Sequence, residues 1–159
     1  MGEAAYELEY ESKGEKQVNL EYNPAPTIEL FHASDAMIRS LVGPAGSGKS
    51  TGMIWEICYF LPQMLYTKYG IKKTRWLILR NTNDQLWTTT MKTLFEWFDP
   101  TWAGKFHKQD KVFTITAFKP LEIEILFRSC DRPEDVNKFR SLELTGYCSV
   151  ESSEDHDWI

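Results

Sequence analysis

Cysteine is scarce in this sequence, with three residues in 159, Cys58, Cys130 and Cys148, and no C-x-x-C pair. An odd number of separated cysteines supports neither a disulfide framework nor a zinc site. Long apolar runs are also missing, because Glu56 and Pro62 interrupt the longest candidate before it reaches the roughly 18 residues of a membrane span. The acidic N-terminus lacks the apolar core of a signal peptide. We therefore expect an intracellular protein with reduced thiols and no membrane contact.

The chain has no basic surplus, since its net charge is −5 and its isoelectric point is about 5.3. Free-standing DNA-binding domains are usually basic, so charge alone predicts no nucleic-acid partner. The acidity is concentrated at the two ends: residues 1–23 and residues 151–159 each carry a net charge of −4, which leaves +3 in the middle. With 42% apolar residues, the chain can fill one sizeable core.

Residues 1–23 are rich in glutamate and poor in aliphatic side chains, and we expect them to form a loosely held acidic arm. The alternative is an edge strand, because Tyr6, Leu8 and Tyr10 alternate with glutamates. The prolines that follow fix φ and predict a stiff turn. We expect residues 24–159 to form a single domain.

One stretch carries a specific motif, because residues 43–50 read GPAGSGKS and match the phosphate-loop pattern G-x-x-x-x-G-K-[ST]. Gly46 and Gly48 let backbone amides approach a polyphosphate without an intervening Cβ. Lys49 would reach the β- and γ-phosphates, and the Ser50 hydroxyl would bind Mg²⁺. The predicted nucleotide-binding residues are Gly43, Pro44, Ala45, Gly46, Ser47, Gly48, Lys49, Ser50 and Thr51. The sequence therefore predicts a site for a nucleotide such as ATP with Mg²⁺.

The residues around the loop fit this interpretation. Residues 37–42 form an apolar run that predicts a buried strand leading into the loop. Apolar residues then recur at i, i+3, i+4 and i+7 from Ile54 to Leu61, which predicts an amphipathic helix that Pro62 kinks or ends. The alternative, a Gly-rich turn before a helix with no ligand, is disfavoured by this order of elements.

Strands and helices alternate after the phosphate loop. The predicted elements are a strand at 75–80, a helix at 82–98, a hairpin of 111–117 and 121–127, a short helix at 131–140 and a strand at 142–150. Thr82 and Gln85 form a capping box at the start of the longer helix. This pattern predicts an α/β fold of the P-loop NTPase type, with a mainly parallel sheet, helices on both faces and a β-hairpin.

Hydrolysis of a bound nucleotide requires further residues. A carboxylate at the end of a strand must orient the attacking water, and Glu151 follows the last predicted strand. The alternative is that Glu151 only begins the exposed acidic tail. An arginine must also stabilise charge on the γ-phosphate, and the candidate arginine fingers or sensors are Arg39, Arg80 and Arg140.

Several short motifs occur in a fixed order along the chain. They are Phe31-His32-Ala33-Ser34, GPAGSGKST at 43–51, Leu79-Arg80-Asn81-Thr82 with Gln85-Leu86, Pro133-Glu134-Asp135-Val136 and Leu142-Glu143-Leu144-Thr145-Gly146. This set resembles the ATPase half of the large terminase subunit of tailed bacteriophages, over residues from about 22 to 155. By position, Lys49 and Ser50 match the phosphate- and magnesium-binding residues of that family, and Glu151 matches its catalytic Walker B glutamate.

The resemblance implies an ATPase that drives double-stranded DNA into a preformed capsid. It further implies a homo-oligomeric ring on the portal protein, a small terminase subunit as partner, and a location in the host cytoplasm at the procapsid. That family commonly places a glutamine upstream of the loop to recognise adenine, and none is found at residues 27–29. Tyr22 or Phe31 could stack on the base, although aromatic residues such as these are more often simply packed.

The sequence departs from that family at Val150, where Asp or Asn commonly precedes the glutamate, and the chain ends soon afterwards at Ile159. We therefore expect an incomplete ATPase domain that is truncated after the Walker B strand and lacks the nuclease domain of the family. One alternative is a catalytically incomplete nucleotide-binding remnant that serves as an assembly or interaction piece. Another is an unrelated small-molecule kinase, which would need an arginine-bearing lid and an acceptor pocket that the sequence does not offer.

Overall fold

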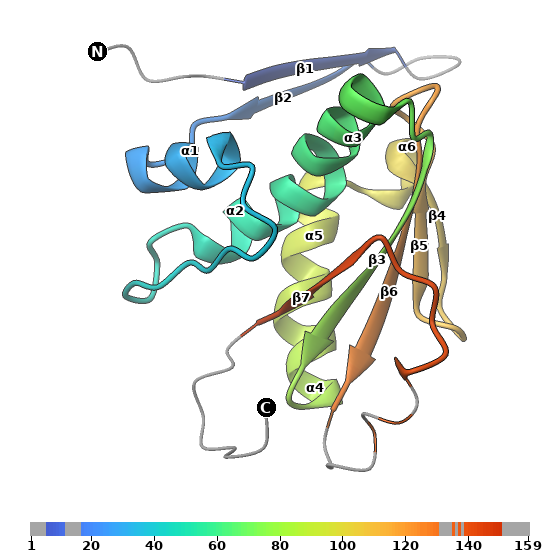
Figure 1. The fold of residues 1–159 in the computed structure, drawn as a ribbon. Coiled ribbons are helices and arrows are strands. Elements are labelled where there is room, and N and C mark those ends of the chain that lie inside the picture. Colours follow the sequence, from blue (N-terminus) through green and yellow to red (C-terminus); the bar gives the residue numbers. More distant parts are fainter. Residues whose placement is uncertain (1–5, 12–16, 131–134, 136, 138, 151–159) are drawn as a thin grey trace. The chain divides into compact units, whose positions relative to one another are not determined.

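A computed structural model describes residues 6–11, 17–130, 135, 137 and 139–150 of the chain (Figure 1). The chain divides into two compact units, Met1–Leu61 and Pro62–Ile159. The first contains the phosphate loop and is called the loop unit below, and the second is called the sheet unit. We describe each unit by itself.

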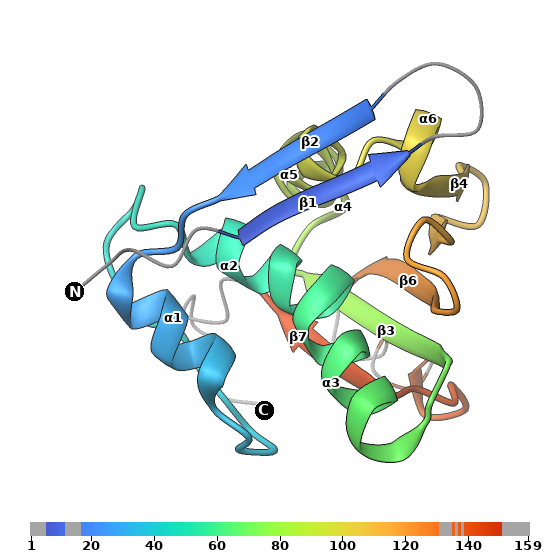
Figure 2. The same cartoon turned by 90° about the horizontal axis from the view of Figure 1, so that it is seen from above.

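The loop unit begins with a two-stranded antiparallel hairpin. Strand β1 (Tyr6–Glu11) pairs with β2 (Gln17–Tyr22), and Tyr6 lies opposite Tyr22. Figure 2 shows the two arrows side by side and pointing in opposite directions. The alternation of tyrosine and leucine with glutamate was therefore the better guide, and the expectation of a loosely held arm was wrong for these two segments. The Tyr6 ring packs edge-on against Phe60, with 4.9 Å between ring centroids.

Helix α1 (Pro26–Ala33) follows the hairpin and was not predicted. Its sequence signals are short but ordinary, because Pro26 lies in the first turn and Glu29 is an acid near the positive end of the helix. Ile28 is 3% exposed and contacts the next helix: a Cβ added to Gly52 would lie 2.7 Å from Ile28 Cγ2. Gly52 therefore permits a close approach between α1 and the helix that follows the phosphate loop.

The prediction of a buried strand at residues 37–42 was wrong. These residues form neither helix nor strand, and Met37, Ile38 and Val42 are 95%, 84% and 95% exposed. A strand is stable only when a neighbouring strand satisfies its backbone N–H and C=O groups. No described strand pairs with this segment, since β1 and β2 pair with each other.

A continuous helical stretch follows the phosphate loop, made of α2 (Lys49–Trp55), the π-helix η1 (Glu56–Phe60) and α3 (Leu61–Tyr69). The predicted apolar stripe is confirmed, because Ile54, Ile57 and Cys58 are at most 3% exposed. Pro62 does not end the helix. A proline lacks an N–H group and its ring crowds the carbonyl four residues earlier, and the wider π-turn just before it relieves that crowding.

The sheet unit contains five strands in the order β4-β5-β6-β3-β7. Their bounds are β3 (Lys73–Arg80), β4 (Gly104–His107), β5 (Val112–Ile115), β6 (Glu122–Ser129) and β7 (Gly146–Ser149). Strands β6, β3 and β7 are parallel, whereas β4 and β5 run antiparallel to their neighbours. The fold is thus α/β as predicted, with a mixed sheet in place of a mainly parallel one. The predicted hairpin is confirmed as β5 and β6.

The predicted helix at 82–98 is confirmed as α4 (Asn83–Gln85), the π-helix η2 (Leu86–Met91) and α5 (Lys92–Trp97). The Thr82 hydroxyl caps it by accepting a hydrogen bond of 3.3 Å from the Gln85 N–H group. Phe95 packs edge-on against Phe113 of β5, with 5.4 Å between ring centroids, so this helix covers one face of the sheet. The chain continues through the short helix α6 (Pro100–Ala103) into β4.

The core of the sheet unit lies along β5, β6 and β3. Phe113, Ile123 and Ile125 have no exposed surface. Three consecutive residues at the middle of β3, 76–78, are at most 5% exposed, so both faces of the sheet are shielded from solvent there. The predicted last strand, residues 142–150, is confirmed in its C-terminal half as β7. The predicted short helix at 131–140 falls partly outside the described residues, and in the described part of the chain no helix is long and apolar enough to cross a membrane.

Candidate nucleotide-binding site

The phosphate-loop residues form one exposed loop that ends where α2 begins. Gly46 and Gly48 have φ angles of +76° and +79°, in the left-handed region that favours glycine. A Cβ added to either glycine would meet no heavy atom within 4 Å. The backbone angle, and not crowding within the chain, therefore requires glycine at these two positions. Residues 43–48 form neither helix nor strand, and residues 49–51 begin α2.

The Lys49 side chain folds back over this loop. Its ammonium group donates hydrogen bonds to the carbonyl oxygens of Gly43 and Pro44, at 2.6 and 2.5 Å, and to the Ser47 hydroxyl at 3.1 Å. The charge is thus held at the mouth of the loop instead of extending into solvent. Ser50 lies in the first turn of α2 and is exposed.

These groups suit a polyphosphate with Mg²⁺. Turns that contain left-handed residues, as at Gly46 and Gly48, can bring neighbouring backbone N–H groups toward one concavity, and such concavities bind anions. The donor set adds one ammonium group from Lys49 and one hydroxyl group from Ser50, which are the groups that the motif assigns to phosphate and to magnesium. Glu151, the predicted water-orienting carboxylate, lies outside the described residues. No cluster of three or more His, Cys, Asp or Glu side chains able to hold a metal occurs among the residues that the structure describes.

The three arginines singled out in the sequence lie in different surroundings. Arg80 is 4% exposed at the end of β3, and Arg140 is exposed in a turn before β7; both belong to the sheet unit. Arg39 belongs to the loop unit, where its guanidinium group is engaged with other groups of that unit. A role in stabilising charge on the γ-phosphate stays a prediction for all three.

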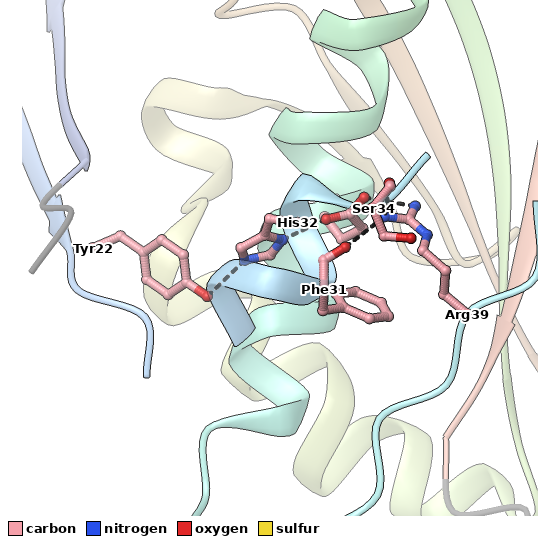
Figure 3. A network of polar contacts seen from close by, with 6 residues as sticks. Tyr22, Phe31, His32, Ser34 and Arg39 are labelled. Carbon is pink, nitrogen blue, oxygen red and sulfur yellow. Dashed lines mark hydrogen bonds and ion pairs between the residues drawn. The ribbon is translucent and has the colours of Figure 1, made fainter. Parts of the chain in front are cut away.

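A buried set of polar side chains accompanies the phosphate loop, and we call Tyr22, His32, Arg39 and Glu56 the polar network (Figure 3). Glu56, in η1, is 3% exposed and lies 2.7 Å through Oε1 from Nη2 of Arg39. Its other oxygen, Oε2, accepts a hydrogen bond from Nδ1 of His32. The Nε2 atom of His32 lies 3.0 Å from the Tyr22 hydroxyl, which completes a chain of contacts from β2 to η1.

The environment of the network affects the phenol of Tyr22. Burial, with a further contribution from the negative charge of Glu56, raises the pKa of Tyr22 well above its usual value. The phenol therefore keeps its proton over the physiological range. An ionised carboxylate can only accept hydrogen bonds, so Nδ1 of His32 carries a proton toward Glu56.

Sequence reasoning missed the network. Glu56 was noted only as a charge that interrupts an apolar run, and that same feature was the available signal. A carboxylate within an apolar run of sequence is costly to bury unless it finds polar partners. The partners His32 and Arg39 lie 24 and 17 positions away in the chain, and spacing alone does not reveal them.

The aromatic candidates for adenine recognition are packed within the loop unit. The Tyr22 ring is 4% exposed and stacks on Trp55, with 4.5 Å between centroids and 5° between planes. Phe31 lies beneath the guanidinium group of Arg39, which is 4.9 Å from the ring centroid. The packing alternative is therefore confirmed for Tyr22, whose ring is covered.

An open groove of about 790 Å³ lies in the sheet unit and contains none of the predicted site residues. Four of its charged side chains form ion pairs, with Lys73 3.2 Å from Glu122 and Arg75 3.0 Å from Glu124. The carboxylate of Glu143 also lines the groove. Comparisons of the chain with models of protein families, with curated proteins and with solved structures found no match.

Proposed function

We propose that this chain binds Mg²⁺-ATP through residues 43–51 and is the ATPase part of a motor that packages double-stranded DNA into a phage capsid. The observation that carries the proposal is the phosphate loop itself, with two left-handed glycines and the Lys49 ammonium group held at its mouth. The motif residues and their order along the chain support a P-loop NTPase of the large-terminase type.

In this proposal each group has one task. The backbone N–H groups of the loop and Lys49 hold the β- and γ-phosphates, and Ser50 holds Mg²⁺. Bound Mg²⁺ would neutralise charge on the phosphate oxygens as the γ-phosphate leaves. Glu151 orients the attacking water, and an arginine from this subunit or a neighbour in a ring stabilises the transferring group.

The second candidate is a nucleotide-binding remnant that binds ATP without hydrolysing it. Val150 favours this candidate. The resembling family commonly has Asp or Asn at this position, and the valine side chain has no oxygen atom to offer to the ligands around the metal. The two candidates share the site at residues 43–51 and differ only in turnover.

The experiment measures Mg²⁺-ATP affinity and ATP turnover side by side for the natural chain, Lys49→Ala and Glu151→Gln. A hydrogen bond to a charged group contributes about 1.5–3 kcal/mol, so Lys49→Ala should weaken binding roughly 10- to 150-fold. Lys68→Ala is the matched control, because Lys68 is an exposed helical lysine outside the loop and its loss should leave affinity unchanged.

The outcomes separate the proposals. Turnover that is lost in Glu151→Gln while binding is kept supports the motor ATPase, and stimulation of turnover by double-stranded DNA and a portal would support packaging. Binding through Lys49 without turnover in any of the chains would favour the remnant. If the natural chain does not bind Mg²⁺-ATP, or if Lys49→Ala binds it as tightly, the nucleotide site is refuted.

A further inference from the structure

The buried ion pair of the polar network joins the two chain segments on either side of the phosphate loop. Arg39 precedes Gly43, the first residue of the loop, and Glu56 follows α2, the helix that leaves the loop. Their side chains are 12% and 5% exposed and lie 2.7 Å apart. The incoming and outgoing segments are thus tied together at points on either side of the loop and α2.

Arg39 makes contacts that a simple point charge could not make. Through Nη1 it donates to the carbonyl oxygens of Phe31 and Ser34, at 2.9 and 3.1 Å, and through Nη2 it contacts Glu56 (Figure 3). The first two contacts lie at the C-terminal end of α1, where the Phe31 carbonyl oxygen also accepts a hydrogen bond of 3.4 Å from the Ser34 N–H group. The planar guanidinium group therefore connects the end of α1, the incoming segment and η1 at one point.

The incoming segment has little regular structure of its own. Residues 34–48 form neither helix nor strand, and Met37 and Val42 on either side of Arg39 are each 95% exposed. The half-buried Arg39 is therefore well placed to define where this segment runs before the loop begins. Glu56 is fixed in turn, because both of its carboxylate oxygens have partners.

A buried ion pair is weak evidence for stability, because the loss of hydration offsets most of the attraction between the charges. Its demand for partners in one geometry makes it suited to fixing a position. We infer that Arg39 and Glu56 clamp the segments that enter and leave the phosphate loop, and so act as positioning residues for its binding of polyphosphate. This inference rests on the proposed function of the loop.

The test compares variants of the full chain that affect the clamp to different degrees. Arg39→Gln removes both the charge and the planar guanidinium group. Arg39→Lys keeps the charge but loses the simultaneous contacts to α1 and Glu56. Tyr22→Phe is the control within the same network, because it removes only the hydroxyl that contacts His32. The readouts are Mg²⁺-ATP affinity, measured below the thermal transition of each variant, and the NMR amide signals of Gly46 and Gly48 without nucleotide.

We expect Arg39→Gln to bind Mg²⁺-ATP about tenfold more weakly. This is the loss expected if only about one molecule in ten has the loop in its binding conformation, because the apparent affinity falls by that fraction. Arg39→Lys should recover part of this loss, and the Gly46 and Gly48 signals should shift or broaden in the same order. Tyr22→Phe should lower the melting temperature while leaving affinity and these signals unchanged. A merely stabilising network would make affinity follow melting temperature in all three variants.

The clamp is refuted if Arg39→Gln is folded and keeps both the affinity and the glycine signals of the natural chain. If Arg39→Gln does not fold, the same criterion applies to Arg39→Lys: the clamp is refuted if that variant keeps both the affinity and the glycine signals of the natural chain. If the natural chain does not bind Mg²⁺-ATP, the proposed function fails, and the glycine signals alone then decide whether Arg39 orders the loop.

Discussion

The core formed by β5 and β6 in the sheet unit and the interior of the loop unit differ in the side chains that fill them. In the sheet unit, apolar side chains of β5 and β6 such as Phe113, Ile123 and Ile125 are fully buried. In the loop unit, stacked aromatic rings surround buried polar groups, and Glu56 is as buried as its apolar neighbour Ile57, at 3% exposed. An apolar core is stabilised by burial itself, whereas a polar one depends on every partner being present.

The two units also differ in what they leave uncovered. The loop unit exposes Leu30 of α1 and also Met37, Ile38 and Val42, three residues of the segment that leads to the phosphate loop. Among the described residues of the sheet unit, the exposed large apolar side chains are Tyr69, Ile71 and Tyr147. The comparison teaches that the loop unit gives up apolar burial where its proposed binding site lies, and the following predictions test that contrast.

The largest effect is expected in the sheet core. Phe113→Ala should lower the free energy of unfolding by about 3–5 kcal/mol, because it removes a fully buried ring that packs edge-on against Phe95. Tyr147→Ala is the matched control in the same sheet and should change it by less than about 1 kcal/mol, since that ring is 71% exposed. Urea denaturation measures both. A loss below about 1 kcal/mol for Phe113→Ala would contradict the apolar account of this unit.

Sequence patterns predicted the sheet unit well and the loop unit poorly, for one physical reason. Alternation and helical periodicity report which face of an element is buried, and that sufficed for β3, the β5–β6 hairpin and the helix at 83–97. These patterns do not show which other segment of the chain an element packs against or pairs with. The apolar run at 37–42 has strand composition but no described strand beside it, and so the prediction was wrong.

The candidate site also has one part that the sequence patterns reveal and one part that they do not. The phosphate loop was predictable because its chemistry is local, with glycines, lysine and serine in consecutive positions. The Arg39–Glu56 pair was not predictable, because the two residues meet only after α1 and η1 have formed. Arg39 was singled out as a candidate finger or sensor, and its buried contacts became visible only in the fold.

A second prediction compares the opening of the two units through the thiols of Cys58, which is buried, and Cys148, which is half-buried. Cys58 reports on the loop unit and Cys148 on the sheet unit; burial raises the pKa of Cys58 well above its usual value and that of Cys148 to about 12. Both thiols should therefore resist alkylation at pH 8 until their surroundings open. Because the loop unit depends on a complete polar network, we expect Cys58 to become reactive at lower urea than Cys148.

Pulsed alkylation followed by mass spectrometry of the two cysteine peptides measures the midpoints separately. Tyr22→Phe provides the internal comparison, because it should move the Cys58 midpoint to lower urea and leave the Cys148 midpoint in place. A single shared midpoint in both chains would mean that the two units unfold as one, and the contrast between them would then have no thermodynamic consequence.

The smallest effect concerns alkaline pH and the phenol of Tyr22. Near neutral pH, Tyr22→Phe should cost about 1 kcal/mol, because it removes the hydroxyl's contact with His32. The folded pKa of Tyr22 is raised, so its stabilising contribution is complete below the unfolded value of about 10 and is lost as pH rises toward the folded value. The gap between the natural chain and Tyr22→Phe should therefore narrow above about pH 10, since other buried thiols and phenols titrate alike in both chains. Urea denaturation at pH 8, 9.5 and 10.5 measures that gap, and a constant difference across the series would show that the phenol is not held protonated by the buried polar network.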